Sequence, residues 1–440
     1  MAGTPANRRV VRALAGPLLL AACGAPASLP DARLLPDAGE PTTDAAPDGP
    51  TSDAAAAGGV TVTLTGDAGL PLVGTAVRFA RSDGSVVELV TDAAGMAADT
   101  IALAATVSAV MLAPGDTRQF PIAYAALDVP AGTHVSFGLP VAAAGGADAT
   151  VNFAGALPSA GQVVTTCASS ATPSGSASAS TPACATSTPV GVLSADGTML
   201  LGELPATQLV AGQTYDLVAP ATLSLGFELL VRNVPARVVD AGAIVIGRHA
   251  GRPLHYASTT LTLGGGVASV ASAFAPFGEA QELTVELVSD LGGRHTWTLP
   301  QVQTPSTDLD ASGGAAMLPW VDGEAIYAGD TGAASWDSSD GADALVDGRI
   351  VYQLFADATA TRQVSYAVLG AGPGTSLVLP PLPEAELVLG AALGTGTAAL
   401  LDCVAGDYAA LAADYLGAAA QSGGMPRGCD ALRVSTYYLV

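Results

Sequence analysis

From Gly59 onward the chain consists of short runs of Val, Leu and Thr that alternate with polar residues and are separated by Gly, Pro and Asp. Val60 to Thr65, Ala76 to Ala80 and Val86 to Val90 are the first of these runs. Alternation with a period of two is typical of strands with one buried face, and the intervening residues are typical of turns. The pattern therefore predicts an all-β protein built from β-sandwich-like modules.

The length of the chain predicts several such modules. Its 440 residues exceed what one hydrophobic core usually organises and indicate roughly three or four domains. Aromatic residues make up only 5% of the chain, so the cores must consist mainly of Val, Leu, Ile and Ala. We expect modules over 59–140, 141–222, 223–306 and 314–440.

Turn signals in the first module carry a family resemblance. A Pro-containing loop runs from Gly69 to Gly74, an Asp83-Gly84 turn follows, and Thr91-Asp92-Ala93-Ala94-Gly95 forms a third turn. This series resembles carboxypeptidase-regulatory-like and bacterial Ig-like modules over about 80 residues. The resemblance implies a β-sandwich that acts as a spacer or binding domain and carries no catalytic groups.

The middle of the chain continues as strands. In the second module, a Ser-, Ala- and Thr-rich tract from Ala168 to Pro182 is interpreted as an exposed loop. The third module contains five candidate strands: Leu225 to Val231, Ala243 to Gly247, Thr259 to Leu263, Glu282 to Val288 and Thr296 to Leu299.

The last module combines a second resemblance with a helix signal. Trp336, followed by an acidic loop and then the strand of Tyr352, resembles fibronectin type III, in which a core Trp packs against a Tyr-bearing strand. Tyr408, Leu411, Tyr415 and Leu416 have helical spacing and predict a short helix within Asp407 to Ala420. A final strand is expected over Leu432 to Val440.

The N-terminus has the layout of an export signal. Three Arg within residues 8–12 precede an apolar run from Ala13 to Ala22, which is too short to span a membrane. The run ends in Leu20-Ala21-Ala22-Cys23, which resembles the lipobox of bacterial lipoproteins. The resemblance implies cleavage after Ala22, lipid on Cys23 and a lipid bilayer as partner. An ordinary secretory signal with a chance cysteine is the alternative.

Residues 24–58 are expected to be a disordered linker. This segment has six Pro and six acidic residues and few apolar ones, so it cannot bury enough surface to fold. Gly24 follows the lipidated position, where Asp would favour retention in the inner membrane of two-membrane bacteria. The resemblance therefore implies an outer-membrane or cell-surface location.

Charge excludes one class of partner. The chain has 39 acidic residues against 16 basic ones, all of them Arg, for a formal net charge of −23. Binding to nucleic acid depends on a basic surface that displaces counterions from phosphates. Nucleic acid is therefore not an expected partner.

The number of cysteines is consistent with an exported protein. Besides Cys23, the chain has Cys167, Cys184, Cys403 and Cys429, an even number that indicates disulfides in an exported protein. Three pairings are open, and proximity in sequence favours Cys167 with Cys184 and Cys403 with Cys429. Metal binding is disfavoured because no Cys-x-x-Cys pair and no neighbouring His is present.

Signals for catalysis are missing from the sequence. His134, His249, His255 and His295 are its only histidines, and neither an H-E-x-x-H nor a G-x-S-x-G motif occurs. We therefore expect no enzyme and no cofactor, but a non-enzymatic array for adhesion, recognition or envelope structure. A hydrolase or carbohydrate-active protein with a site on sandwich loops is the alternative, and a protein or glycan ligand stays open.

Two acidic loops suggest calcium as a minor hypothesis. Asp308 to Gly313 matches the first half of a calcium loop, but its twelfth position is Pro319 instead of Glu. Asp337, Asp340, Asp343 and Asp347 cluster beside Trp336. Acidic turns are common on surfaces, so no metal site is predicted.

Overall fold

The computed structural model describes residues 58–437 except for 67–69, 101–103, 113–120, 140–147, 185–186, 303–304, 313–316, 360–361, 384–386 and 418–424. The regular structure in this part is almost entirely β, with a single α-helix, α1 (Tyr408–Asp414), near its C-terminal end. A short 3₁₀ turn, η2, spans Asp343–Leu345. The predicted all-β fold with one short helix near the C-terminus is confirmed.

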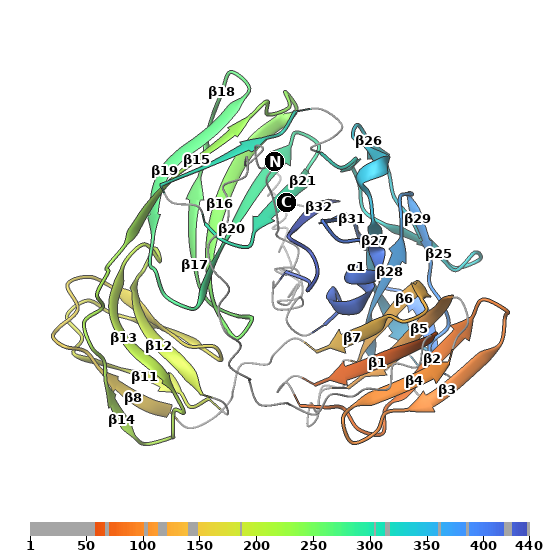
Figure 1. Ribbon diagram of the computed structural model, residues 1–440, viewed down its shortest axis with the longest axis horizontal. Helices are drawn as coiled ribbons and strands as arrows, with labels where there is room; N and C mark the ends of the chain where they lie inside the picture. The colour runs from red at the N-terminus through yellow and green to blue at the C-terminus, as the bar shows by residue number, and fades with distance from the viewer. Residues whose placement is uncertain are drawn as a thin grey trace, which may run out of the picture.

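A long sheet of 13 strands runs through the molecule (Figure 1). Its order is β17 (Arg252–Thr260), β16 (Val238–His249), β20 (Ala280–Ser289), β21 (Gly293–Leu299), β32 (Ala431–Tyr437), β31 (Thr397–Val404), β27 (Gly348–Asp357), β28 (Gln363–Ala371), β6 (Ile122–Pro130), β5 (Ala104–Met111), β2 (Ala76–Arg81) and β3 (Val86–Val90). The thirteenth strand, β30 (Leu389–Ala392), pairs with β27. We call this assembly the long sheet.

Smaller sheets lie against the long sheet or form the second module. The first module adds β4 (Met96–Thr100), β1 (Gly59–Thr65) and β7 (His134–Gly138), and the third adds β18 (Thr262–Gly264), β19 (Val267–Phe274), β15 (Leu225–Arg232) and β22 (Ser306–Asp310). The last module adds β23 (Trp320–Val321) with β26 (Ser338–Ser339), and β24 (Ile326–Ala328), β25 (Ala333–Ser335) and β29 (Ser376–Val378).

The second module is a sandwich of its own. One sheet contains β10 (Ser169–Thr172), β9 (Gly161–Val164), β12 (Thr188–Ser194) and β13 (Leu200–Thr207), and the other contains β11 (Ser178–Pro182), β8 (Asp148–Asn152) and β14 (Thr214–Asp216). The Ser-rich tract is therefore not a loop, because it forms β10 and β11 in two different sheets. Small side chains are compatible with short strands at the edges of both sheets.

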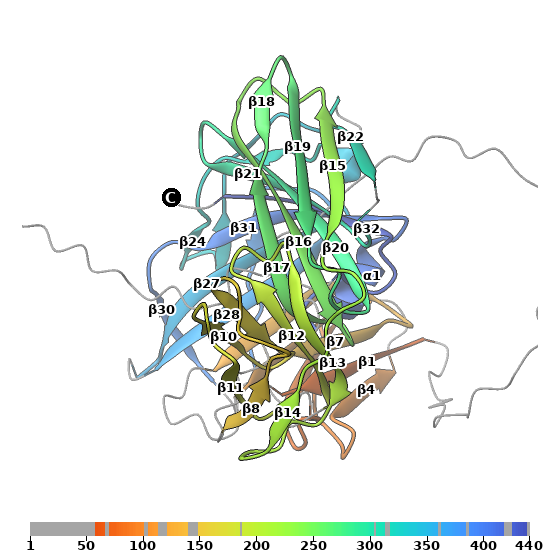
Figure 2. The same cartoon turned by 90° about the vertical axis from the view of Figure 1, so that its left-hand side faces the viewer.

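Two pairings join strands of different modules that are far apart in sequence. β21 of the third module pairs antiparallel with β32, where His295 lies opposite Ser435. β6 of the first module pairs in parallel with β28, where Ile122 lies opposite Ser365. In Figure 1 the second module and the first module lie at opposite ends of an arch, with the β21–β32 pair between them. Figure 2 shows the second and third modules from their outer side.

The hydrophobic cores are distributed in agreement with the strand pairings, and one of them is shared by two modules. One core contains Val62 and Phe79 of the first module together with Leu369, Leu401 and Leu411 of the last. A second core fills the third module, and a third fills the second module. Because the first and last modules share one core, their folding is coupled through buried apolar side chains.

Helix α1 extends the layer formed by β4, β1 and β7. Asp407 caps its first turn by accepting a hydrogen bond from the Ala410 amide at 3.1 Å. Leu411, Tyr415 and Leu416 are buried in the shared core, as their helical spacing predicts. The helix packs beside β7, and just after the helix the Leu416 carbonyl accepts a hydrogen bond from the Gly138 amide at 2.9 Å.

Candidate functional site

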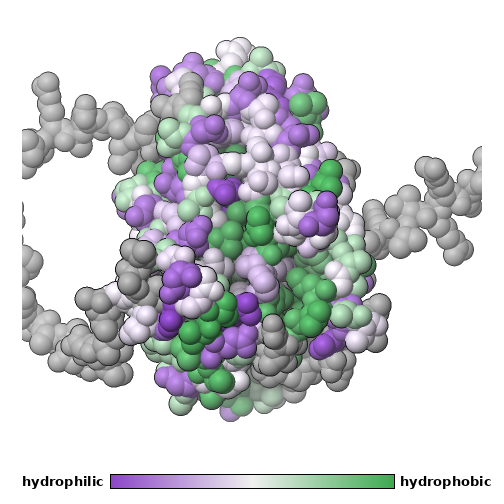
Figure 3. Space-filling view, turned by 90° about the vertical axis from the view of Figure 1, so that its right-hand side faces the viewer, coloured by the Kyte–Doolittle hydropathy of each residue, from purple (hydrophilic) through white to green (hydrophobic). Residues whose placement is uncertain are grey.

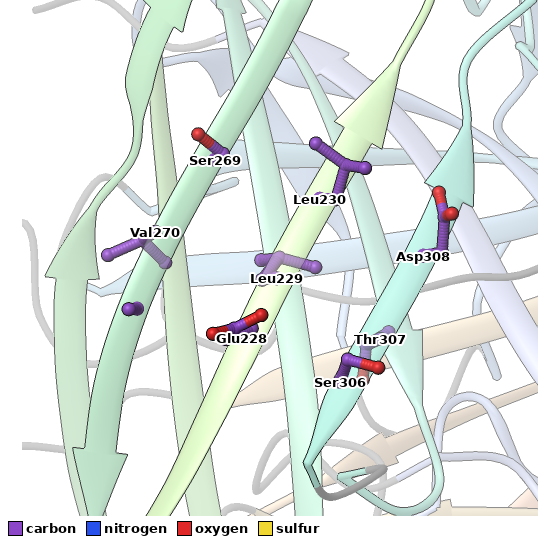
Figure 4. A pocket seen from close by; sticks show the side chains of 9 residues that line it. Glu228, Leu229, Leu230, Ser269, Val270, Ser306, Thr307 and Asp308 are labelled. Carbon is purple, nitrogen blue, oxygen red and sulfur yellow. The ribbon is translucent and has the colours of Figure 1, made fainter.

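A shallow groove lies on the outer face of the third module, across β19, β15 and β22 (Figure 4). It encloses about 450 Å³ and is lined by Glu228, Leu229, Leu230, Ser269, Val270, Ala271, Ser306, Thr307 and Asp308. Because side chains alternate along each strand, Glu228 and Leu230 face outward while Phe227 and Leu229 enter the core. We call this concavity the outer groove.

The charges of the outer groove are acidic and partly compensated. Arg232 forms an ion pair with Asp308 at one end. Next to this pair, hydrogen bonds from Asn233 and Ser312 lower the pKa of Asp310. These interactions fix the end of β22 against β15.

Aromatic and charged side chains meet at the joint between the third and last modules. The ring of His295, on β21, meets the Trp320 ring edge-on with 4.3 Å between the ring centroids. Arg237 lies over the same Trp320 ring, 4.9 Å from its centroid. Arg237 also donates to Asp322 at 2.6 Å, which fixes the third module to the last one.

Two histidines, His255 and His295, are buried inside the protein. Burial lowers the pKa of His295 to about 3 and that of His255 to about 4, so both imidazoles are neutral at pH 7. The Nε2 atom of His255 lies 3.1 Å from the Phe277 carbonyl, which fixes the ring between the second and third modules. Neither ring lines the outer groove.

Buried carboxyls are held by arginines. Burial raises the pKa of Glu282, which forms an ion pair with Arg248 at 2.6 Å. It also raises the pKa of Asp402, which accepts a hydrogen bond from Arg433 at 2.6 Å. Burial accounts for the raised pKa of both carboxyls, while the arginines oppose the shift, so structural burial explains these values without a reacting group.

The acidic loops do not converge on one point. Asp337, Asp340 and Asp343 are exposed, and Asp340 approaches Arg237 at 3.4 Å. Asp347 instead turns toward the interior, where its carboxylate accepts from the Cys403 amide at 2.8 Å. Within the described ranges, no three His, Cys, Asp or Glu side chains are grouped so that they could hold a metal ion.

The four cysteines form the two disulfides that proximity in sequence favours. Cys167 bonds to Cys184 and Cys403 bonds to Cys429. The first bridge links the residues that flank β10 and β11 and so joins the two sheets of the second module. The second connects the end of β31 with the start of β32 and encloses α1.

We expect removal of the second disulfide to destabilise the shared core. Its partners are separated by 26 residues, so a Cys403→Ser and Cys429→Ser double variant should lose about 3 kcal/mol, mainly because the unfolded chain gains freedom. Denaturant unfolding of both proteins measures the difference. Equal stabilities of the variant and the unaltered protein under oxidising conditions would contradict the expectation.

Cys23, the predicted lipid-attachment residue, and all of the linker before Gly58 lie outside the described residues. The described part contains no helix that is both long and apolar enough to cross a membrane. The outer groove and the polar joint have no motif in the sequence, since their residues come from segments that are far apart. The alternation of apolar and polar residues along β15 could have predicted that Glu228 faces outward. It could not have predicted which residues of β19 and β22 lie beside Glu228.

Sequence comparisons give no relatives for this chain: no protein-family model and no curated protein match it. Comparison with solved structures finds the TIE protein of Bacillus anthracis at 13% identity, with 57% of this chain and 49% of that chain covered and a TM-score of 0.15. The chain thus spans about half the length of that protein.

Two further structures have the same level of similarity. BcpA, the major pilin subunit of Bacillus cereus, is 11% identical over 57% of this chain and 98% of its own, with a TM-score of 0.13. The fimbrial protein FimP of Actinomyces oris is 12% identical over 71% of this chain and 78% of its own, with a TM-score of 0.14. At these TM-scores the similarities establish no property of this chain.

Proposed function

We propose that this chain is an exported bacterial lipoprotein whose β-sandwich modules form a non-enzymatic framework for adhesion or recognition at the cell surface. The pairing of cysteines carries the proposal. Of the five cysteines, four form disulfides, and the fifth is Cys23 in the lipobox-like sequence. Disulfides persist in oxidising compartments outside the cytoplasm, where a lipobox would direct the protein.

The framework itself supports a role in recognition. The long sheet connects three of the four modules, and the second module packs against the third through Leu193, Leu254 and Phe277. A frame of this kind holds the outer groove and the exposed strands in fixed positions. Binding surfaces that are fixed before contact lose less conformational freedom on association.

Membrane anchoring is tested by Cys23→Ala in cells. We expect the unaltered protein in the membrane fraction with an acyl mass on Cys23, and the variant released, because several acyl chains on one residue bind a bilayer stably. Fractionation and mass spectrometry of the N-terminal peptide measure both properties. A Cys167→Ala and Cys184→Ala variant is the matched control, and it should stay in the membrane.

Location is tested by adding protease to intact cells. Cleavage of the modules from outside supports a surface role, whereas complete protection would contradict it and place the protein within the envelope. A Cys23→Ala protein that stays in the membrane without an acyl mass would refute the anchor.

A further inference from the structure

Strand β3 ends the long sheet with an exposed backbone edge. β3 pairs with β2 alone among the described strands. The Thr91 amide donates to the Thr75 carbonyl at 3.0 Å, and Ala76 lies opposite Val90 in the same ladder. Because hydrogen-bonded pairs alternate in antiparallel strands, the N–H and C=O groups of Val86, Glu88 and Val90 point away from β2.

The side chains along this edge are unusually apolar. Val86 is 45% exposed and Val90 is 64% exposed, on the same face of the strand as Glu88. The neighbouring loop adds Leu70 and Val73, both more than 60% exposed. Figure 3 shows apolar surface on the flank that carries β3. An edge of this kind is a ready template for another strand.

Other edge strands of the described part have features that block pairing. β4 carries the inward-facing Asp99, which pairs with Arg81 at 2.7 Å, and helix α1 packs beside β7. Pro occurs in β11, β13 and β17, Asp308 and Asp310 occur in β22, and the remaining edges are only two to four residues long. β3 has five residues and lacks both Pro and an inward-facing charge. Its one charged side chain, Glu88, lies on the exposed face beside Arg78 and disfavours only those strands that place an acid opposite it.

Charge selects the kind of strand that fits. Glu88 lies beside Arg78, with 3.4 Å between Nη1 and Oε1. An incoming basic residue opposite Glu88 would extend a row of alternating charges, whereas an acidic one would be repelled. A second copy paired over the full strand would place Glu88 opposite Glu88, and each copy has a net charge of −23. The edge therefore disfavours a second copy.

We propose that β3 binds an extended segment of a partner protein, in which β-branched residues flank a basic residue that faces Glu88. The segment adds a strand to the long sheet, so that backbone hydrogen bonds provide affinity and the basic residue provides selectivity. This inference rests on the proposed function, since it names the surface and the partner class for recognition.

Two nine-residue probes test the inference with the full-length chain: acetyl-TTVTRTVTT-amide and the matched acetyl-TTVTETVTT-amide. We expect isothermal titration calorimetry to report tighter binding of the Arg peptide by about threefold to fivefold, the effect of one cross-strand charge pair. Glu88→Arg should reverse the preference. Equal binding of both peptides, or binding of neither, would overturn the inference.

The backbone contribution is tested at Val90. Val90→Pro removes an N–H that points away from β2, so it should leave the fold intact and weaken binding about tenfold or more. Val90→Thr keeps the N–H and should bind the Arg peptide like the unaltered chain. Equal binding by the two variants would refute strand addition. Dimerisation of the chain through β3, detected by sedimentation and abolished by Val90→Pro, would show that a second copy occupies the edge and would overturn the assignment to a partner protein.

Failure here is distinguishable from failure of the proposed function. A chain that is acylated and exposed on cells but binds neither peptide refutes the β3 inference alone. A chain that binds the Arg peptide in solution but is protected inside intact cells refutes the surface role and leaves the strand-addition chemistry in place.

Discussion

A proline at Val434 will destabilise the protein by about 3 kcal/mol or more, because it interrupts a strand that is paired on both sides. Val434 is fully buried in β32, opposite Thr296 of β21 and Leu401 of β31. Proline has no amide hydrogen to donate to a neighbouring strand, and its ring is sterically unfavourable in a central strand. Chemical denaturation of the full-length chain measures the loss of stability.

The matched control for this substitution is Val90→Pro. It introduces the same residue at the end of the same sheet, where the lost N–H has no partner strand, so we expect a cost of about 1 kcal/mol or less. Hydrogen exchange adds a regional readout. Val434→Pro should increase exchange in both β21 and β31, whereas the second module should keep its protection. Equal costs for the two prolines would contradict a sheet that is continuous through β32.

Acidification will destabilise the protein through its two buried histidines. The pKa of His255 is lowered to about 4 and that of His295 to about 3 by burial. The unfolded chain binds a proton at each His below about pH 6.5, while the folded chain does not. The contribution of the two histidines to the free energy of unfolding is therefore fully present above pH 6.5. It falls by about 1.4 kcal/mol per pH unit for each His as the pH decreases toward 4.

Burial explains why the folded protein excludes these protons. His295 is fully buried against Trp320, and protonation would place a charge between two apolar cores. The Nδ1 atom of His255 has no hydrogen-bond partner among the described residues, so a second N–H there would be unsatisfied. The raised pKa values of Glu282 and Asp402 act in the opposite direction, because these groups bind protons more readily in the folded state.

A His255→Gln and His295→Phe double variant isolates the effect of the histidines. Its stability should depend on pH less steeply than that of the unaltered protein, by up to about 2.7 kcal/mol per pH unit between pH 4.5 and 6. Urea unfolding at several pH values measures both slopes. Equal slopes would contradict the prediction, and NMR titration of the imidazole signals checks the two pKa values directly, without a variant.

Much of the local structure could be predicted because each element depends on its own residues. Val86 to Val90 is the strand that alternation predicts, and helical spacing of Leu411, Tyr415 and Leu416 identifies α1. The disulfide pairing also followed from proximity in sequence. The Ser-rich tract was predicted wrongly, because its polarity was interpreted as a loop while strand pairing with β8 and β9 determined its conformation.

The sequence by itself determined the class of fold and the positions of strands with clear alternation, and it favoured the cysteine pairing that the structure has, since periodicity and short-range spacing encode these features. Only the tertiary structure decided which strands join modules. The pairing of β21 with β32 brings together residues more than 130 positions apart, and it buries His295 opposite Ser435, with the ring of Trp320 against that of His295. Tertiary structure also decided that β3 is the exposed end of the long sheet, because β2 is its only partner among the described strands and an edge is defined by the absence of a neighbour and not by its own residues.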